Sequence, residues 1–254
     1  MNSFVSFIIS QLHSIVKSLH CAADGFVLQS WQQYCTFYGA FQQRRVYSLK
    51  VLLINGSPHE KGCTYTALSL IAGELKAQGV ETEILHVGGQ PVGGCIGCGG
   101  CRSGSGCVFG GVVNEAIEKA KTADAFVFGS PVHYASAAGN MASFMDRLAY
   151  AGGKYLAYKP AAVCCSARRA GTTSTLDQLV KYPQFFHMPL VNGSYWAMVH
   201  GSNPEQVLQD AEGCAVMQEL GRNMAWLLHC IEAGKAAGID HPQNPPRPMT
   251  SFIR

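Results

Sequence analysis

The chain has 254 residues, 48% of them hydrophobic, and a formal net charge of only +3, so it is long enough to bury a full core. No basic stripe and no apolar run of transmembrane length occur, so neither nucleic acid nor a membrane is expected as a partner. Eleven cysteines in a chain this long do not suit a small secreted disulfide scaffold, and the clustering of four between Cys95 and Cys107 favours metal or redox chemistry in a reducing compartment.

Residues 1–48 differ in composition from the rest of the chain. Asp24 is their only acidic residue, whereas serine recurs and the basic residues include Arg44 and Arg45. Two explanations fit equally: an organelle transit peptide, or a start codon assigned too early with the protein beginning near Tyr47. Under either one we expect residues 1–48 to lie outside the fold. The expected location is the cytoplasm, or an organelle matrix if the segment is a transit peptide.

The stretch Lys50–Thr66 carries the first predicted strand and the first candidate site. Its apolar run, residues 51–54, predicts a parallel strand buried on both faces, and an amphipathic helix follows Gly62. A polar loop between a strand and a helix N-terminus suits an anion, because the first helix amides point outward and the helix dipole is positive there. Hydroxyls on both sides of the loop favour a phosphate site over a plain helix cap. They belong to Ser57, Thr64 and Thr66.

Strands and helices alternate through the rest of the chain. Further strands are predicted at 81–87, 125–129, 161–165 and within 189–199, and further helices at 112–121, 138–149, 173–181 and 211–233. Five short apolar strands separated by helices predict an α/β fold: a doubly wound five-stranded parallel sheet with helices on both faces. The proline-bearing tail, 240–254, is expected to be extended and peripheral.

Ligands of such sheets bind beyond the C-terminal strand ends, which makes the loops after the first, third and fourth strands the candidate sites. The third-strand loop places His133 and Tyr134 before small residues that would let a flat ring approach backbone amides, although both could be ordinary packing residues. The loop after the fourth strand carries Arg168. Alone it would be a solvated basic turn, but beside the other two loops it could meet negative charge on a bound ring or a nucleotide phosphate.

Together, the stretches Lys50–Thr66, Ser130–Arg147 and Pro160–Thr173 resemble the NADPH-dependent FMN reductases of the flavodoxin-like fold, over about residues 50–239. The resemblance implies FMN bound noncovalently and reduced by NAD(P)H, in a homodimer or homotetramer. It implies that the FMN phosphate is held by Ser57, His59, Cys63, Thr64 and Thr66, that the isoalloxazine is flanked by Pro131, Val132, His133 and Tyr134, and that its other side is closed by Ser166, Arg168 and Gly171.

Two positions depart from the pattern of that family. His59 stands where arginine is frequent, and Cys63 stands where asparagine is frequent. Both exchanges could weaken the affinity for FMN without abolishing it.

Cys95, Cys98, Cys101 and Cys107 form a compact motif in a glycine-rich loop after the second strand. The glycines allow tight turns and leave amides free to donate to sulfur, and zinc fits less well because structural zinc usually takes two separated cysteine pairs. The motif resembles that of the iron–sulfur flavoproteins, a branch of the same fold with a [4Fe-4S] cluster near FMN. Many FMN reductases are similar in having cysteines here, so the occupancy of the loop stays open.

The sequence therefore predicts an FMN-dependent NAD(P)H oxidoreductase that passes electrons to a small-molecule acceptor. The flavin would carry the chemistry, and no catalytic side chain is assigned. The alternative is an iron–sulfur flavoprotein that carries electrons from ferredoxin without NAD(P)H turnover. A third hypothesis, a cysteine-based redox or metal sensor, would need no flavin and would be colourless when pure.

Overall fold

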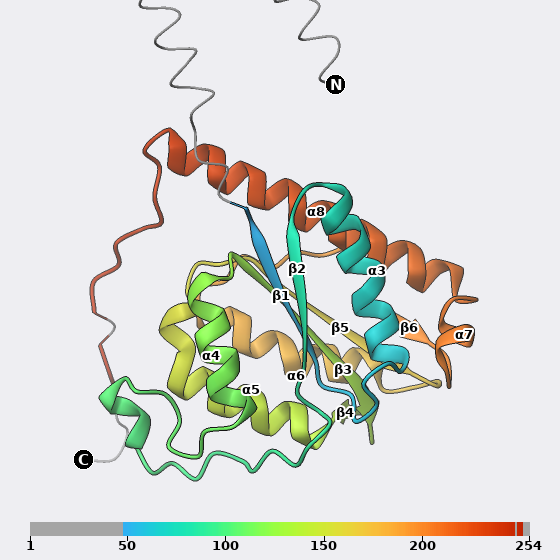
Figure 1. Cartoon of the computed structure of the whole chain (residues 1–254), viewed down its shortest axis with the longest axis horizontal. Coiled ribbons are helices and arrows are strands. Elements are labelled where there is room, and N and C mark those ends of the chain that lie inside the picture. The colour runs from blue at the N-terminus through green and yellow to red at the C-terminus, as the bar shows by residue number, and fades with distance from the viewer. Residues whose placement is uncertain (1–47, 247, 251–254) are drawn as a thin grey trace, which may run out of the picture. The chain divides into compact units, whose positions relative to one another are not determined.

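The computed structural model describes residues 48–246 and 248–250 (Figure 1). The chain divides into two units, Met1–Tyr47 and Ser48–Arg254. The expected leader therefore lies outside the described residues, apart from Ser48. No helix in the described part of the chain is long and apolar enough to cross a membrane.

Five parallel strands, in the order β2-β1-β3-β5-β6, form the centre of the fold. This order places a topological switch point between β1 and β3, as in other flavodoxin-like sheets, and the predicted doubly wound parallel sheet is confirmed. The strands are β1 (Lys50–Asn55), β2 (Glu81–His86), β3 (Ala125–His133), β5 (Ala161–Ala167) and β6 (Met198–His200), with a short β4 (Ser136–Ala137) antiparallel to β3.

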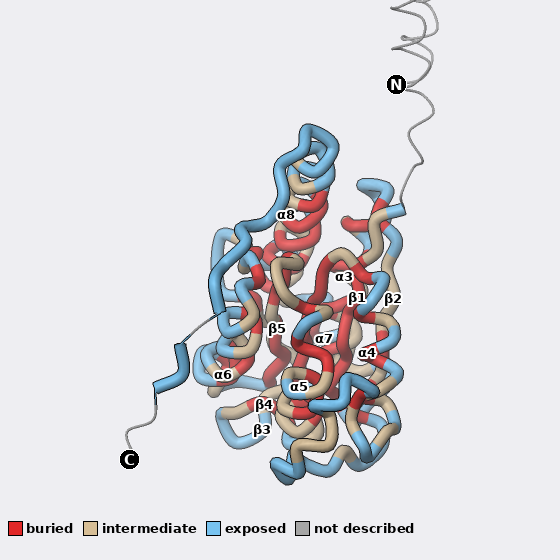
Figure 2. The backbone as a smooth tube through the Cα atoms, turned by 90° about the vertical axis from the view of Figure 1, so that its left-hand side faces the viewer, coloured by how far each residue is buried: buried red, intermediate tan, exposed pale blue. Residues whose placement is uncertain are grey.

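Helices cover both faces of the sheet (Figure 1). They are α3 (Cys63–Ala77), α4 (Val112–Thr122), α5 (Gly139–Gly152), α6 (Thr172–Phe185), α7 (Pro204–Val207) and α8 (Ala211–Ala236), with 3-10 turns η1 (Gly100–Ser103) and η2 (Gly153–Tyr155). Successive β1 side chains point to opposite faces, so Val51 and Leu53 join one core beneath α3 and α8, and Leu52 and Ile54 join another beneath α4 and α5. Figure 2 shows these buried layers and the exposed loops around them.

The third strand is longer than predicted. It runs through Pro131 to His133 and turns back as β4, where a loop was expected. β1 pairs with β3 only as far as Gly129, whereas Pro131 still pairs with Ser166 of β5. The missing N–H of Pro131 therefore removes no hydrogen bond on the side that β1 has already left.

The last strand and three helices also differ in their bounds. Within the predicted 189–199, only an isolated bridge at Leu190 and the start of β6 at Met198 pair with β5, so most of that segment is loop. Helix α6 extends past the predicted 181 to Phe185, and Pro183 lies in its final turn. Helices α5 and α8 each run three residues beyond the predicted ends at 149 and 233.

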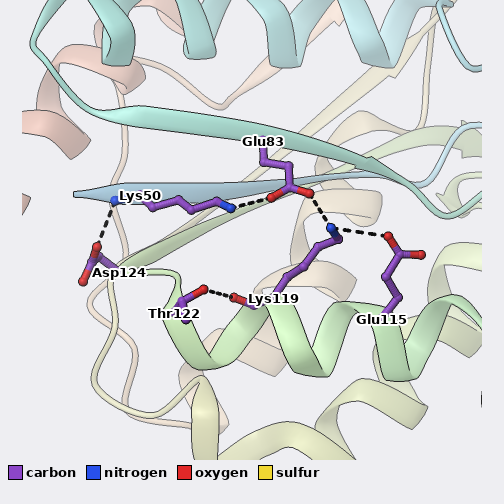
Figure 3. A network of polar contacts seen from close by, with 6 residues as sticks. All are labelled: Lys50, Glu83, Glu115, Lys119, Thr122 and Asp124. Carbon is purple, nitrogen blue, oxygen red and sulfur yellow. Dashed lines mark hydrogen bonds and ion pairs between the residues drawn. The ribbon is translucent and has the colours of Figure 1, made fainter. Parts of the chain in front are cut away.

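An ion-pair network joins β1, β2 and α4 (Figure 3). The Glu83 carboxylate receives Lys50 Nζ at 2.6 Å and Lys119 Nζ at 2.5 Å, and Lys119 also lies 3.5 Å from Glu115. The backbone N–H of Lys50 donates to Asp124 Oδ2 at 2.9 Å. These contacts tie the start of the edge strand β2 to its neighbours.

Candidate functional site

The loop after β1 is fixed from two strands. Asn55 is fully buried at the end of β1, where its Oδ1 accepts from the Ser57 N–H at 3.1 Å and its Nδ2 donates to the Glu60 carbonyl at 2.9 Å. His86, at the end of β2, donates from Nε2 to the Ser57 carbonyl at 2.8 Å, because a carbonyl oxygen can only accept. A Cβ on Gly88 would come within 2.1 Å of that carbonyl oxygen. The backbone at Ser57 is thereby held in one conformation.

Two buried hydroxyls face this loop. The exposed fractions of Ser57 and Thr64 are 4% and 1%. Ser57 Oγ accepts from the His59 N–H at 3.1 Å, which leaves the hydroxyl proton of Ser57 available for another acceptor. Thr64 Oγ1 lies 2.8 Å from Ser166 Oγ, so the first turn of α3 meets the end of β5 here. Two of the sequence-predicted site residues, Thr64 and Ser166, are thus brought together.

The first turn of α3 is open to an anion. Its N-cap residue, Gly62, carries no side chain that could cap the helix, and no side-chain cap bond is present. Free helix N-terminal amides next to buried hydroxyls fit the phosphate of FMN. This agreement between the residues present and the expected group supports the phosphate assignment of Ser57 and Thr64.

The other predicted phosphate residues lie differently. The Thr66 hydroxyl donates to the Gly62 carbonyl at 3.2 Å within the helix, and His59 is exposed on the loop. Cys63 Sγ lies 3.6 Å from the Gly201 carbonyl. Burial raises the pKa of the Cys63 thiol, so this side chain stays neutral and adds no negative charge beside a phosphate.

A strained hairpin tip follows β3. Tyr134 and Ala135, the two residues between β3 and β4, have φ angles of +52° and +58°. Two left-handed residues in a two-residue loop match the twist of a β-hairpin, but they cost free energy when neither is glycine. The Tyr134 side chain is fully exposed, and His133 is exposed beside it. Pro131 and Val132 lie half-buried in the strand below.

Side chains of helix α6 hold this hairpin in place. Gln178 Oε1 accepts from the hydroxyl and the N–H of the two β4 residues at 2.6 and 2.9 Å, and Ser174 Oγ donates to the Ala135 carbonyl at 2.7 Å. Gly171, with φ +92°, lies so close that a Cβ on it would be 2.7 Å from Ala135 Cα. The loops after β3 and β5 are therefore in direct contact. Arg168 is exposed on the second of them.

The four cysteines of the glycine-rich loop line a single cavity of about 310 Å³. Cys95 and Cys98 are exposed, whereas Cys101 and Cys107 are half-buried. The turns that bring them together use left-handed glycines, which no other residue adopts as easily. These are Gly97, Gly99, Gly104 and Gly106.

Among the described residues, no three His, Cys, Asp or Glu side chains converge closely enough to hold one metal ion. A larger hollow of about 570 Å³ lies beside Lys50 and Glu83. It is at the amino-terminal end of β1, away from the carboxyl ends where ligands of such sheets bind.

Two side chains that the sequence did not single out fix Cys107. Asn114 of α4 accepts from the Cys107 N–H at 2.8 Å and donates to its carbonyl at 3.0 Å. Arg147 of α5 donates from Nε to Cys107 Sγ at 3.3 Å. Asn55, His86 and the residues just named carry no local motif, since their roles arise only when distant segments meet.

The match to known proteins agrees with this geometry. Residues 49–203 match the family model described as NADPH-dependent FMN reductase. An iron-sulfur flavoprotein of Methanocaldococcus jannaschii is 27% identical over 192 residues, which cover 72% of this chain and 100% of that protein. An iron-sulfur flavoprotein of Archaeoglobus fulgidus is 35% identical over 99 residues, which cover 39% of this chain but only 48% of that protein.

Solved structures share the fold. The structure of RosB with a bound 8-demethyl-8-formylriboflavin-5'-phosphate intermediate has a TM-score of 0.57 at 14% identity, over 81% of this chain and 94% of that one. The apo form of the NADH:FMN oxidoreductase EmoB has a TM-score of 0.53 at 17% identity, over 70% of this chain and 89% of that one. At these identities the likeness shows the fold alone.

Proposed function

Because the chain belongs to the NADPH-dependent FMN reductase family, we propose that it is an FMN-dependent oxidoreductase that takes its electrons from NAD(P)H. The observation that carries the proposal is the meeting of three loops at the carboxyl edge of the sheet. Thr64, in the first turn of α3 after the first loop, reaches Ser166 at the end of β5 just before the third loop, and Gly171 of the third loop packs on Ala135 of the second. A flavin bound there would contact all three.

The residues of the chain bind and orient the cofactor in this proposal. Ser57, Thr64 and the open amides of α3 would hold the phosphate, which matches their burial and donor geometry. The hairpin at Tyr134 and the loop that carries Arg168 would flank the ring. FMN, when bound, accepts a hydride from a nicotinamide and releases electrons to an acceptor, so no side-chain acid, base or nucleophile is needed.

We propose further that Cys95, Cys98, Cys101 and Cys107 ligate one [4Fe-4S] cluster that exchanges electrons with FMN. Their shared cavity and the buried arginine beside Cys107 support this assignment, and relatives of the chain are named iron-sulfur flavoproteins. The loop follows β2, at the same carboxyl edge as the flavin loops. The acceptor would be a small molecule, and the protein would act as a homodimer or homotetramer.

A second candidate function is an electron carrier that receives electrons from ferredoxin and does not turn over NAD(P)H. The exposure of Cys95 and Cys98 favours it, since an exposed cluster edge could exchange electrons with a protein. Anaerobic mixing of the FMN-loaded protein with NADPH or NADH separates the two. Loss of the oxidised-flavin absorbance within seconds of adding either nucleotide supports the NAD(P)H oxidoreductase. An unchanged spectrum with both nucleotides, followed by reduction with reduced ferredoxin, would replace it with the carrier.

A further inference from the structure

Arg147 is a buried cation whose charge the proposed flavin site does not use. Its exposed fraction is 7%, although it lies on α5 among apolar core residues. Within residues 48–246 and 248–250 no carboxylate forms an ion pair with it. A buried charge costs free energy unless hydrogen bonds or an opposite charge compensate it. The hydrogen bonds of Arg147 therefore indicate which part of the structure it stabilises.

Its three polar contacts within the described part of the chain all belong to one loop. Nη1 donates to the Gly93 carbonyl at 3.4 Å, Nη2 donates to the Gly110 carbonyl at 3.0 Å, and Nε donates to Cys107 Sγ at 3.3 Å. Gly93 and Gly110 stand on either side of the four cysteines. The guanidinium also lies 5.7 Å from the centroid of the Phe109 ring. The planar guanidinium of Arg147 therefore contacts both ends of the cysteine loop and one sulfur inside it.

The contact with sulfur is separate from the contacts that fix the backbone. Asn114 already holds the N–H and the carbonyl of Cys107, so the direction of the Cys107 side chain is left to its own rotamer and to Arg147. Ligated cysteine is a thiolate, and an N–H donor on a thiolate both orients it and offsets its charge. A lysine could supply the charge but not three donors in a fixed plane.

We propose that Arg147 is a positioning residue that closes the cysteine loop before the cluster arrives and aims the Cys107 sulfur into the cavity. This inference rests on the proposed cluster for its purpose, but the closure itself is a property of the chain without iron. By neutralising part of the thiolate charge, Arg147 also makes the loaded cluster easier to reduce.

The test compares Arg147→Met and Arg147→Lys with Arg102→Met in the full FMN-loaded chain. Arg102 lines the same cavity but is exposed, so its loss is the matched control. Hydrogen exchange is measured on amides 94–109 before iron is added. We expect exchange there to accelerate about tenfold or more in Arg147→Met, as for the loss of charge-assisted hydrogen bonds, while the amides of β1 and β3 keep their rates. Arg147→Lys should lie between Arg147→Met and the native protein, and Arg102→Met should match the native protein.

The same variants are then reconstituted anaerobically with iron and sulfide. Arg147→Met should retain less than about half the iron of the native protein, and the cluster that it retains should have a lower reduction potential than in Arg147→Lys, which keeps the positive charge. Native exchange rates at 94–109 in both Arg147 variants would overturn the inference. If the native protein takes up no iron while Arg147→Met still loosens the loop, the cluster proposal fails and the closure by Arg147 stands. If Arg147→Met does not fold, Arg147→Lys alone decides by the same two measurements.

Discussion

The hydroxyl oxygens of Thr64 and Ser166 lie 2.8 Å apart, although the two residues are 102 positions apart in the chain. Thr64 starts α3 after the first strand, and Ser166 lies near the end of β5, on the far side of β3. The bond therefore lies at the carboxyl ends of the strands and reaches past β3, the strand between β1 and β5. It couples the first turn of α3 to the end of β5, next to the loop that would close over the flavin ring.

The first prediction is that the buried hydroxyls hold the FMN phosphate. Replacing Thr64 with Val and Ser57 with Ala removes two donors, and each lost charge-assisted bond should weaken FMN binding by roughly 1.5–3 kcal/mol. Fluorescence titration of flavin-free protein measures the affinity. Thr64→Ser keeps the hydroxyl and should bind FMN nearly as the native protein does. Unchanged affinity in the Thr64→Val, Ser57→Ala double variant would remove these residues from the site.

The second prediction concerns the contact between Gly171 and the strained hairpin. Gly171→Ala places a side chain at φ +92° and 2.7 Å from Ala135 Cα, so it should lower the free energy of unfolding by about 1–3 kcal/mol and weaken FMN binding. Gly73→Ala is the control, since a Cβ there has no atom within 4 Å and the residue lies inside helix α3. That change should stabilise the protein by about 0.5–1 kcal/mol. Equal urea midpoints for the two variants would show that the hairpin tolerates displacement.

The third prediction follows from the network in Figure 3. Hydrogen bonds from Lys119 and then Lys50 hold the pKa of the Glu83 carboxyl below its usual value. A carboxylate with a lowered folded-state pKa stabilises the protein above its unfolded pKa of about 4.3, and this stabilisation is lost as the pH falls through the folded value. Because the three side chains are partly exposed, the contribution should be about 1 kcal/mol or less.

Urea unfolding of native protein and Glu83→Gln at several pH values checks this. The difference in free energy of unfolding should be largest at neutral pH, should shrink on acidification below about pH 4, and should also shrink in high salt. A difference that does not change with pH would mean that Glu83 acts through packing rather than charge.

The fourth prediction is that residues 1–47 are dispensable for flavin binding. The chain divides between Tyr47 and Ser48, and the family match begins at residue 49. A chain that begins at Ser48 should bind FMN with unchanged affinity in the same titration. Loss of the flavin spectrum in the shortened protein would make the first segment part of the fold.

The sheet could be predicted because each buried strand is a local apolar run. Residues 51–54 must lie inside whatever packs around them, and the helical periodicity of residues 63–75 allows few other arrangements. The hairpin after β3 could not be predicted, because Pro131 usually ends a strand. Pro131 can remain in β3 only because β1 stops pairing with β3 at Gly129, and this depends on the tertiary structure.

Within the candidate site, residues next to a strand end or in a compact motif were predictable, whereas their supports were not. Ser57, Thr64 and the four cysteines stand in local patterns. Arg147 lies on a predicted amphipathic helix without a local motif, and its role depends on a loop some forty residues earlier in the chain. The role of Asn55 was equally hard to predict. Its polar side chain ends an apolar strand, and its function becomes clear only from its hydrogen bonds to the following loop.

The visible absorption spectrum of anaerobically purified protein, with iron assayed on the same sample, reports FMN and the proposed cluster together. We expect a yellow to brown protein that carries about one FMN per chain, a broader cluster absorbance beneath the flavin bands, and about four irons. Cys98→Ala should then lose the iron and keep the flavin, because the phosphate loop is a separate segment of the chain. A colourless protein that takes up neither FMN nor iron on reconstitution would contradict the account and would favour a cysteine-based sensor.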